Sequence, residues 1–344
     1  MANVTIHDVA REAGVSIATV SYVLNNRRRV GEEARQRVLQ AVQSLGYRPN
    51  ITARNLQAGE TRLLGYSWRP TPPDQFNPIL DRFLHAVAEA AAIHGYRVLT
   101  FPTPSLEAEL ATYEEMILIG QVDGFVLSNT NRNDVRVRNL LDTGFPFVSF
   151  GRANPEWDFP WVDVDGAKGV RQATVHLIQQ GHRRIACLAW PEDSLTGHYR
   201  LQGYLAAMDQ AGLCVEAGWI VIAENTHADA YAKTLGLLAL PPPQRPTAIV
   251  AMSDLMAMGV INAGWDAGLE VGRDLAVVGF DDAPIARFLR PSLTSISQPL
   301  DQVGEHLVNM LMTLIKGRRL ARRQILLAPH LVVRDSTVRP WIDR

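Results

Sequence analysis

Several features are scarce in this 344-residue sequence, and each shortage excludes a class of protein. Only two cysteines occur, Cys187 and Cys214, without metal-site spacing, so we expect a reducing, cytoplasmic location. No apolar run approaches the roughly 20 residues that span a bilayer, and residues 1–30 lack the pattern of a secretion signal. A soluble protein with no membrane partner is therefore expected.

The motifs of common enzyme chemistry are also missing. The chain has no glycine-rich phosphate loop, no zinc-binding spacing and no nucleophile elbow. Asp281 and Asp282 are adjacent carboxylates, but neighbours in sequence need not face one substrate, and His182 begins a strand at the end away from a ligand site. We expect no catalysis, no metal and no cofactor, with structural roles for Asp282 and His182.

Charge is unevenly distributed, although the formal net charge is only −1. Residues 1–60 contain eight arginines and no lysine against five carboxylates, an excess of three positive charges. A basic segment joined to a more acidic remainder suggests an anionic partner for that segment.

Three short helices are predicted within this basic segment. Thr5 can cap the first, with Asp8 near its positive end, and Gly14 follows it. Ser16 can cap the second, and the third runs from Glu32 to Leu45.

The second helix has two distinct faces. Val20, Val23 and Leu24 turn into the small core shared by the three helices. At about 100° per residue, the outward residues are Ala18, Ser21, Tyr22 and Asn25, with Ile17 near the exposed first turn. This neutral, short-chained surface suits a helix-turn-helix, whose second helix contacts base edges in the major groove. A helical cap on a larger domain is the alternative.

Residues 49–60 predict a hinge. Pro49 ends the preceding helix, and Asn50 can cap the segment Ile51–Gln57. Seven residues are too few for a stable isolated helix, because nucleation is costly. We expect a segment that becomes helical only when something packs on it; a flexible linker is the alternative.

From Thr61 onward, strand and helix patterns alternate, and the rhythm restarts after Asn154–Pro160. Repeated βα units imply parallel sheets with helices on both faces. The predicted fold class is therefore α/β, with an all-α head and two doubly wound parallel-sheet subdomains enclosing a cleft. Ligands of such sheets bind beyond the carboxyl ends of strands, which here carry Trp68, Ser128, Phe150, Trp190, Ser253 and Asp281. Aromatic rings and carboxylates suit a mono- or disaccharide.

At this point the residues resemble a known family. "TIHDVAREAGVSIATVSYVLNN" followed by "RVLQAVQSLGYRPNITARNL" is similar to the DNA-binding head of the lactose-repressor (LacI/GalR) family. The blocks "HLIQQGHRRIACL", "TAIVAMSD", "LAVVGFDD", "PSLTSISQP" and "LVVRDST" match its core in order. The resemblance covers essentially the whole chain. It implies a homodimeric, ligand-controlled transcription regulator whose core is similar to type I periplasmic sugar-binding proteins.

The resemblance also implies roles for head and hinge residues. Base contacts fall at Ile17, Ala18 and Tyr22, and phosphate contacts at Thr5, Ser16, Thr19, Ser21 and Asn25. Tyr22 departs from the Arg or His frequent in the family, so bidentate guanine recognition by arginine is unavailable there. In the hinge, Ala53 and Leu56 match positions where two hinge helices meet and a leucine wedges into the minor groove, and Asn50 and Arg54 are expected to contact the DNA as well.

The implied domains are a head at residues 1–48, a hinge at 49–60 and a core at 61–344. The first subdomain would hold about 61–161 plus 299–327, and the second about 162–298 plus 328–338, with crossings near Trp161, Gln298–Leu300 and Leu327–Pro329. Arg200 and His227 match effector-binding positions, and Phe76 lies in the loop entering the first core helix.

These observations predict a repressor of carbohydrate-utilisation genes that binds double-stranded operator DNA as a homodimer. A sugar-like effector between the subdomains would control operator affinity allosterically. The alternative is a solute-binding protein of a sugar transport system, which would share the core but would need an export signal and lack the helical head.

Overall fold

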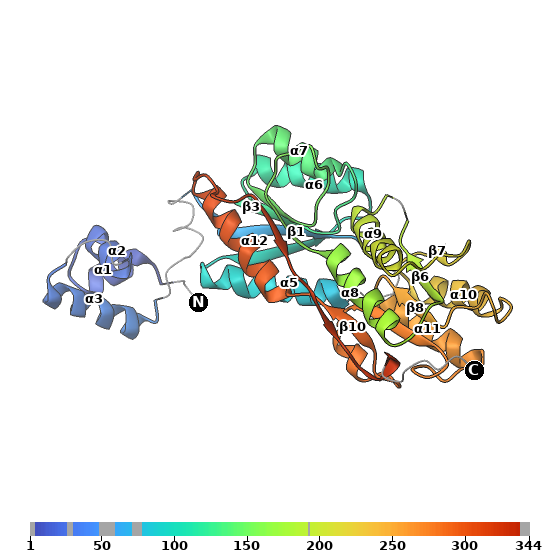
Figure 1. The fold of residues 1–344 in the computed structure, drawn as a ribbon. Coiled ribbons are helices and arrows are strands. Elements are labelled where there is room, and N and C mark those ends of the chain that lie inside the picture. Colours follow the sequence, from blue (N-terminus) through green and yellow to red (C-terminus); the bar gives the residue numbers. More distant parts are fainter. Residues whose placement is uncertain (1–3, 26–29, 48–58, 71–77, 192, 338–344) are drawn as a thin grey trace. The chain divides into compact units, whose positions relative to one another are not determined.

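A computed structural model of the chain describes residues 4–25, 30–47, 59–70, 78–191 and 193–337. The chain divides into two compact units, Met1–Thr61 and Arg62–Arg344, called here the head and the core (Figure 1). Within the described residues, no helix is both long and apolar enough to span a membrane.

The head contains α1 (Ile6–Glu12), α2 (Ile17–Asn25) and α3 (Glu32–Leu45). Valines and alanines from all three helices form one small core, made of Val9, Ala10, Ala13, Val20, Val23, Val38 and Ala41. Leu24 packs against this core while half-buried, so the predicted inward face of α2 is confirmed. The predicted bounds of the third helix are confirmed as well.

The first sheet of the core has the strand order β11-β5-β4-β3-β1-β2, and all of its pairings are parallel. Its strands are β1 (Leu63–Trp68), β2 (Arg97–Pro102), β3 (Gly124–Leu127), β4 (Phe147–Phe150), β5 (Trp161–Val164) and β11 (Gln324–Leu327). On one side α5 (Pro78–Ile93) packs with α12 (Leu300–Ile315). On the other side α6 (Leu106–Leu118) and α7 (Val135–Thr143) cover a second apolar cluster (Figure 1).

The second sheet has the order β12-β10-β9-β8-β6-β7, and only β12 runs antiparallel to its neighbour. Its strands are β6 (Ile185–Ala189), β7 (Ile220–Ile222), β8 (Ala248–Ala251), β9 (Ala276–Asp281), β10 (Thr294–Ser297) and β12 (His330–Val332). The pairs α8 (Gly166–Gln179) with α9 (Leu195–Gln210), and α10 (His227–Leu238) with α11 (Asp254–Asp266), pack together. The predicted α/β class, with two mainly parallel sheets behind a helical head, is confirmed.

The first crossing between the sheets corrects the sequence-based placement. β5 pairs with β4 and β11, so the chain leaves the first sheet after Val164 and not near Trp161. The short apolar sequence of β5 fits either sheet, and its position directly after the loop at 154–160 favours the second sheet when only the sequence is considered. The chain returns between β10 and α12 and crosses again between β11 and β12.

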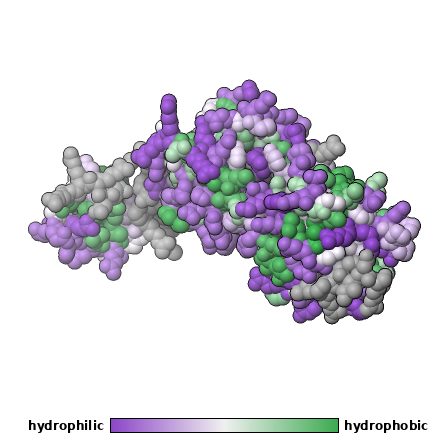
Figure 2. All heavy atoms as spheres, in the orientation of Figure 1, coloured by the Kyte–Doolittle hydropathy of each residue, from purple (hydrophilic) through white to green (hydrophobic). Residues whose placement is uncertain are grey.

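The buried apolar side chains of the core pack into the clusters against its two sheets. On the face drawn in Figure 2, hydrophilic residues predominate and apolar residues appear in smaller areas between them. A polar ligand site is therefore expected at the carboxyl ends of the strands of both sheets.

Candidate DNA-contacting helix and effector cleft

The outward face of α2 is an accessible, mostly uncharged surface. Ile17 is 41% and Tyr22 is 37% exposed, whereas Val20 and Val23 on the opposite face are buried. Ala18, which lies between Ile17 and Tyr22 in the sequence, is also exposed. The helix therefore presents to solvent the side chains that the resemblance assigned to base contacts.

Hydroxyl groups that the resemblance assigned to phosphate contacts also hold the helix ends. The Ser16 hydroxyl accepts from the Thr19 amide at 3.1 Å and lies 2.9 Å from the Thr19 hydroxyl. At α1, the Thr5 amide and hydroxyl donate to Asp8 at 3.0 and 2.7 Å, and the hydroxyl bond in particular lowers the pKa of Asp8. These groups are thus fixed in place before any DNA is bound.

The structure places the remaining predicted head residues only in part. Ser21 is half-buried on α2, and Asn25 is the last residue of that helix. The predicted hinge contacts Asn50, Ala53, Arg54 and Leu56 lie outside the described residues, as does Phe76 in the core.

A cleft of about 380 Å³ lies between the two subdomains of the core, where strands of both sheets end. This volume falls within the range of roughly 300–1,000 Å³ for small-molecule sites. Four of the predicted effector residues line it: Phe150, Trp190, Arg200 and Asp281.

Arg200 occupies the centre of the polar part of this cleft. Its guanidinium carbon lies 3.6 Å from the ring centroid of Phe280 and 4.6 Å from that of Trp190. One terminal nitrogen donates to the Met252 carbonyl. The buried Nε atom has no hydrogen-bond partner among the described residues. An unsatisfied buried donor is costly, so a ligand acceptor at Nε would stabilise the site.

Asp281 is the last residue of β9, and neighbouring polar side chains hold Asp281 and Asp282 in place. Asp281 and Asp282 adopt φ values of 120° and 49°, a left-handed region that non-glycine residues rarely occupy and that often marks binding sites. Gln298 donates to Asp281 at 2.7 Å, and Arg334 pairs with Asp282 at 2.6 Å. Burial raises the pKa of Asp281 to about 6, opposed by Arg200 and by the Gln298 bond.

The cleft contains acidic and amide residues that sequence reasoning missed. They are Asn129, Asn131, Asp163, Asp193, Glu224, Asn225 and Gln298. Gln298 directly follows β10, so the strand-end rule could have found it. Asp163 lies inside β5, where no strand-end signal exists, and receives a bond of 2.7 Å from Arg152. Burial raises the pKa of Asp163 against the opposing charge of Arg152.

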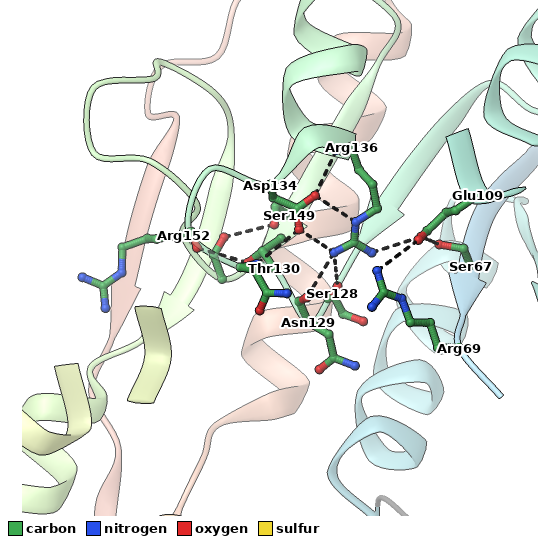
Figure 3. A network of polar contacts seen from close by, with 12 residues as sticks. Ser67, Arg69, Glu109, Ser128, Asn129, Thr130, Asp134, Arg136, Ser149 and Arg152 are labelled. Atoms are coloured by element: carbon green, nitrogen blue, oxygen red, sulfur yellow. Dashed lines mark hydrogen bonds and ion pairs between the residues drawn. The ribbon is translucent and has the colours of Figure 1, made fainter. Parts of the chain in front are cut away.

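Trp68 and Ser128 line a neighbouring hollow of the first subdomain instead of the cleft itself. Ser128 is buried, its hydroxyl lies 2.9 Å from the Tyr66 hydroxyl, and its carbonyl accepts from Arg136 at 3.1 Å. Figure 3 shows Ser128 within a polar network that joins α6 and α7 to the strand ends. Trp68 is 43% exposed.

Two further predicted residues stand elsewhere. Ser253 caps α11 and donates to Asn225 at 2.6 Å, so it orients a residue of the cleft without lining it. The structure does not bring His227 to the cleft. As the first residue of α10 it bonds Asn262 at 2.8 Å in a separate hollow beside Trp265. Glu224 and Asn225, which directly follow the strand segment before α10, take the place expected for it.

Comparison with known proteins now identifies the family. Residues 5–50 match the family model described as bacterial regulatory proteins, lacI family, and residues 174–337 match a periplasmic binding protein-like domain. The HTH-type transcriptional repressor CytR of Escherichia coli K12 is 33% identical over 337 residues, covering 97% of this chain and 96% of the relative. The chain belongs to the LacI family. It is a DNA-binding transcriptional regulator and not an enzyme, as its repressor relatives are not.

Solved structures agree with this assignment. A LacI-family regulatory protein from Chloroflexus aggregans is 48% identical, with TM-score 0.77, over 80% of this chain and 99% of that one. The regulator CelR in complex with cellobiose is 32% identical, with TM-score 0.74, over 97% and 100%. The lac repressor dimer bound to operator and the anti-inducer ONPF is 26% identical, with TM-score 0.83, over 98% and 99%. A transport protein is not favoured, because residues 5–50 match the lacI-family model and the HTH-type repressor CytR matches 97% of this chain.

Proposed function

We propose that this LacI-family regulator represses carbohydrate-utilisation genes as a homodimer on operator DNA, under the control of a neutral mono- or disaccharide bound in the cleft. The observation that carries the effector assignment is a cleft in which the Arg200 guanidinium lies among acidic residues of both subdomains, with its buried Nε unpartnered among the described residues. A sugar hydroxyl or ring oxygen accepts from the guanidinium, while neighbouring hydroxyls donate to carboxylates.

The charge of the cleft selects against anionic ligands. Among the described residues, its lining holds one guanidinium, Arg200, against four carboxylates, those of Asp163, Asp193, Glu224 and Asp281. Sugar phosphates and sugar acids would meet this acidic surface at short range, where like charges repel strongly. The rings of Phe150 and Trp190 supply apolar surface that suits the faces of a pyranose.

Contacts between the two subdomains at the cleft can couple ligand binding to DNA binding by the head. Arg152 of the first subdomain places its guanidinium carbon 3.7 Å from the ring centroid of Tyr199 in the second. Arg132 and Asp193 join the subdomains by a backbone hydrogen bond of 3.2 Å. A ligand that favours one subdomain angle shifts the population of that angle, and operator affinity changes because operator binding favours one angle as well. By linkage, operator DNA then changes ligand affinity by the same factor.

On the DNA side, we propose that Ile17, Ala18 and Tyr22 contact bases while Thr5, Ser16, Thr19, Ser21 and Asn25 contact phosphates. The hinge residues Asn50, Ala53, Arg54 and Leu56 would complete the interface when two copies bind together. Leu56→Ala should then weaken operator binding and leave effector binding intact. A regulator of chromosomal genes works beside the chromosome, so we propose a cytoplasmic location.

A thermal-shift screen of the full chain tests the effector class. The panel contains neutral monosaccharides, neutral disaccharides, sugar phosphates and nucleosides. We expect stabilisation by at least one neutral saccharide, since a ligand at 100 times its Kd adds roughly 2.7 kcal/mol. Stabilisation by sugar phosphates alone would contradict the charge argument.

A further inference from the structure

The hollow beside the cleft is large and is built mainly from the first subdomain's polar network. It measures about 610 Å³, and we call it the Glu109 compartment. Glu109 of α6 and Arg136 of α7 line it, and Trp68 stands at its border with 43% of its surface exposed. It shares three lining residues with the cleft, namely Leu80, Asn129 and Asn131. A ligand that fills the cleft can therefore extend into this compartment.

Among the described residues, only one oxygen of the Glu109 carboxylate has hydrogen-bond partners. Oε1 accepts hydrogen bonds from Arg136 at 3.1 Å and from the Ser67 hydroxyl (Figure 3). It also accepts from the Tyr113 hydroxyl at 3.1 Å. Oε2 is buried and has no hydrogen-bond partner among the described residues. The Glu109 side chain is only 1% exposed, so water outside the protein does not compensate this oxygen. A buried carboxylate oxygen without a donor is costly.

A second, exposed cation lies close to this oxygen. Arg69 Nη2 lies 4.0 Å from Glu109 Oε2, too far for a direct hydrogen bond. An oxygen atom does not fit between two atoms at this distance, but after an outward shift of Arg69 a hydroxyl can donate to Oε2 and accept from Nη2, as a bridging water does. The Arg69 side chain is 57% exposed and can move to admit such a group.

The lining also indicates a neutral ligand unit. The guanidinium groups of Arg69 and Arg136 balance the carboxylates of Asp81 and Glu109. The exposed indole of Trp68 offers an apolar face to a ring, and rings with hydroxyl groups that both donate and accept are characteristic of sugars. An anionic unit would compete with Glu109 for Arg69 and leave Oε2 without a donor.

We propose that the Glu109 compartment binds the second unit of a neutral two-unit saccharide whose first unit occupies the cleft. This inference rests on the proposed carbohydrate effector and narrows its class from any small sugar to a disaccharide or a related glycoside. A hydroxyl of the second unit enters between Glu109 and an outwardly shifted Arg69, and Trp68 covers one face of its ring.

Isothermal titration calorimetry on the full chain tests this inference. The probes are cellobiose, maltose, lactose and trehalose, with glucose and galactose as their single units. We expect one disaccharide to bind at least tenfold more tightly than its single units. Glu109→Gln and Arg69→Ala should each weaken that disaccharide about tenfold or more, because each removes a hydrogen bond to a charged group. The affinity for the single units should change less than twofold.

Arg69→Ala keeps the experiment decisive if Glu109→Gln fails to fold, since Arg69 is exposed. The matched control is Arg138→Ala, which removes an equally exposed arginine, at 58%, from a surface ion pair with Asp142. It should leave all affinities unchanged. A single unit that binds as tightly as every disaccharide, or variants that weaken both alike, would overturn the compartment while leaving the carbohydrate effector standing. Binding of no neutral saccharide would overturn both proposals.

Discussion

The guanidinium carbon of Arg200 lies 3.6 Å from the ring centroid of Phe280. This contact holds a buried arginine near Asp281 and Asp163 without saturating its donors. The cation–π contact stabilises a desolvated charge, and the buried Nε has no partner among the described residues. The cleft is therefore preorganised for a ligand that forms hydrogen bonds.

Arg200→Ala should abolish the response of operator binding to effector while operator binding itself persists. Removing the guanidinium removes the charged donor proposed for the effector, which is worth about 1.5–3 kcal/mol, so effector affinity should fall roughly tenfold to 100-fold. Fluorescence anisotropy with a labelled operator, with and without effector, measures both properties. Arg200→Lys retains the charge but not Nε and should also lose the response. A normal response in either variant would remove Arg200 from the effector site.

Effector affinity should rise between pH 5 and pH 7. Burial holds the pKa of Asp281 at about 6, so the ionised form that accepts sugar hydroxyls predominates only above that pH. The gain is limited to about tenfold per pH unit. Calorimetric titration at several pH values tests this, and Asp281→Asn should give weak binding with a flat profile. Equal wild-type affinity at pH 5 and pH 7 would contradict the assignment.

The same shift has a consequence for the stability of the free protein. Because the pKa of Asp281 in the folded state lies above its ordinary value of 3.8, the protonated form contributes to stability below pH 3.8. That contribution is lost as pH rises through about 6. Asp281→Asn should therefore gain stability relative to wild type at pH 7 and less so at pH 5, as measured by urea unfolding.

Gly203→Ala should destabilise the core by about 2 kcal/mol or more, within the range for overpacking. A Cβ at Gly203 would overlap the carbonyl of Ala167, where α9 and α8 pack together. Gly236 in α10 has no atom within 4 Å of such a Cβ, so Gly236→Ala should instead add about 0.5–1 kcal/mol. Urea unfolding of both variants measures the pair. Equal stabilisation of both variants would show that helix propensity, and not the contact with Ala167, decides.

Ser16→Ala should weaken the head and leave the effector site untouched. The hydroxyl caps α2 by accepting from the Thr19 amide, and its loss costs about 1 kcal/mol. Operator affinity should fall by tenfold or more, since the phosphate contact proposed for Ser16 is lost with the cap. Ser44→Ala is the matched control, because the Ser44 hydroxyl only donates to the Ala41 carbonyl of its own helix. Loss of effector binding in Ser16→Ala would contradict the independence of the two sites.

Sequence patterns predicted most of the fold but only part of the site. The 3.6-residue periodicity located the head helices, since each carries one apolar face, and the strand-end rule found Phe150, Trp190 and Asp281. β5 was misplaced because four residues that fit either sheet carry no signal of their pairing partner. Glu109 and Arg136 lie 27 residues apart on different helices, and no local pattern indicates that such a pair meets.

We propose that a small molecule in the cleft decides whether this protein binds a specific DNA sequence. The most direct measurement is affinity selection of genomic fragments by the full chain, sequenced with and without the saccharide that stabilises it. We predict enrichment of a short, two-fold symmetric site whose recovery changes with the saccharide. Equal recovery of all fragments under both conditions would contradict the account.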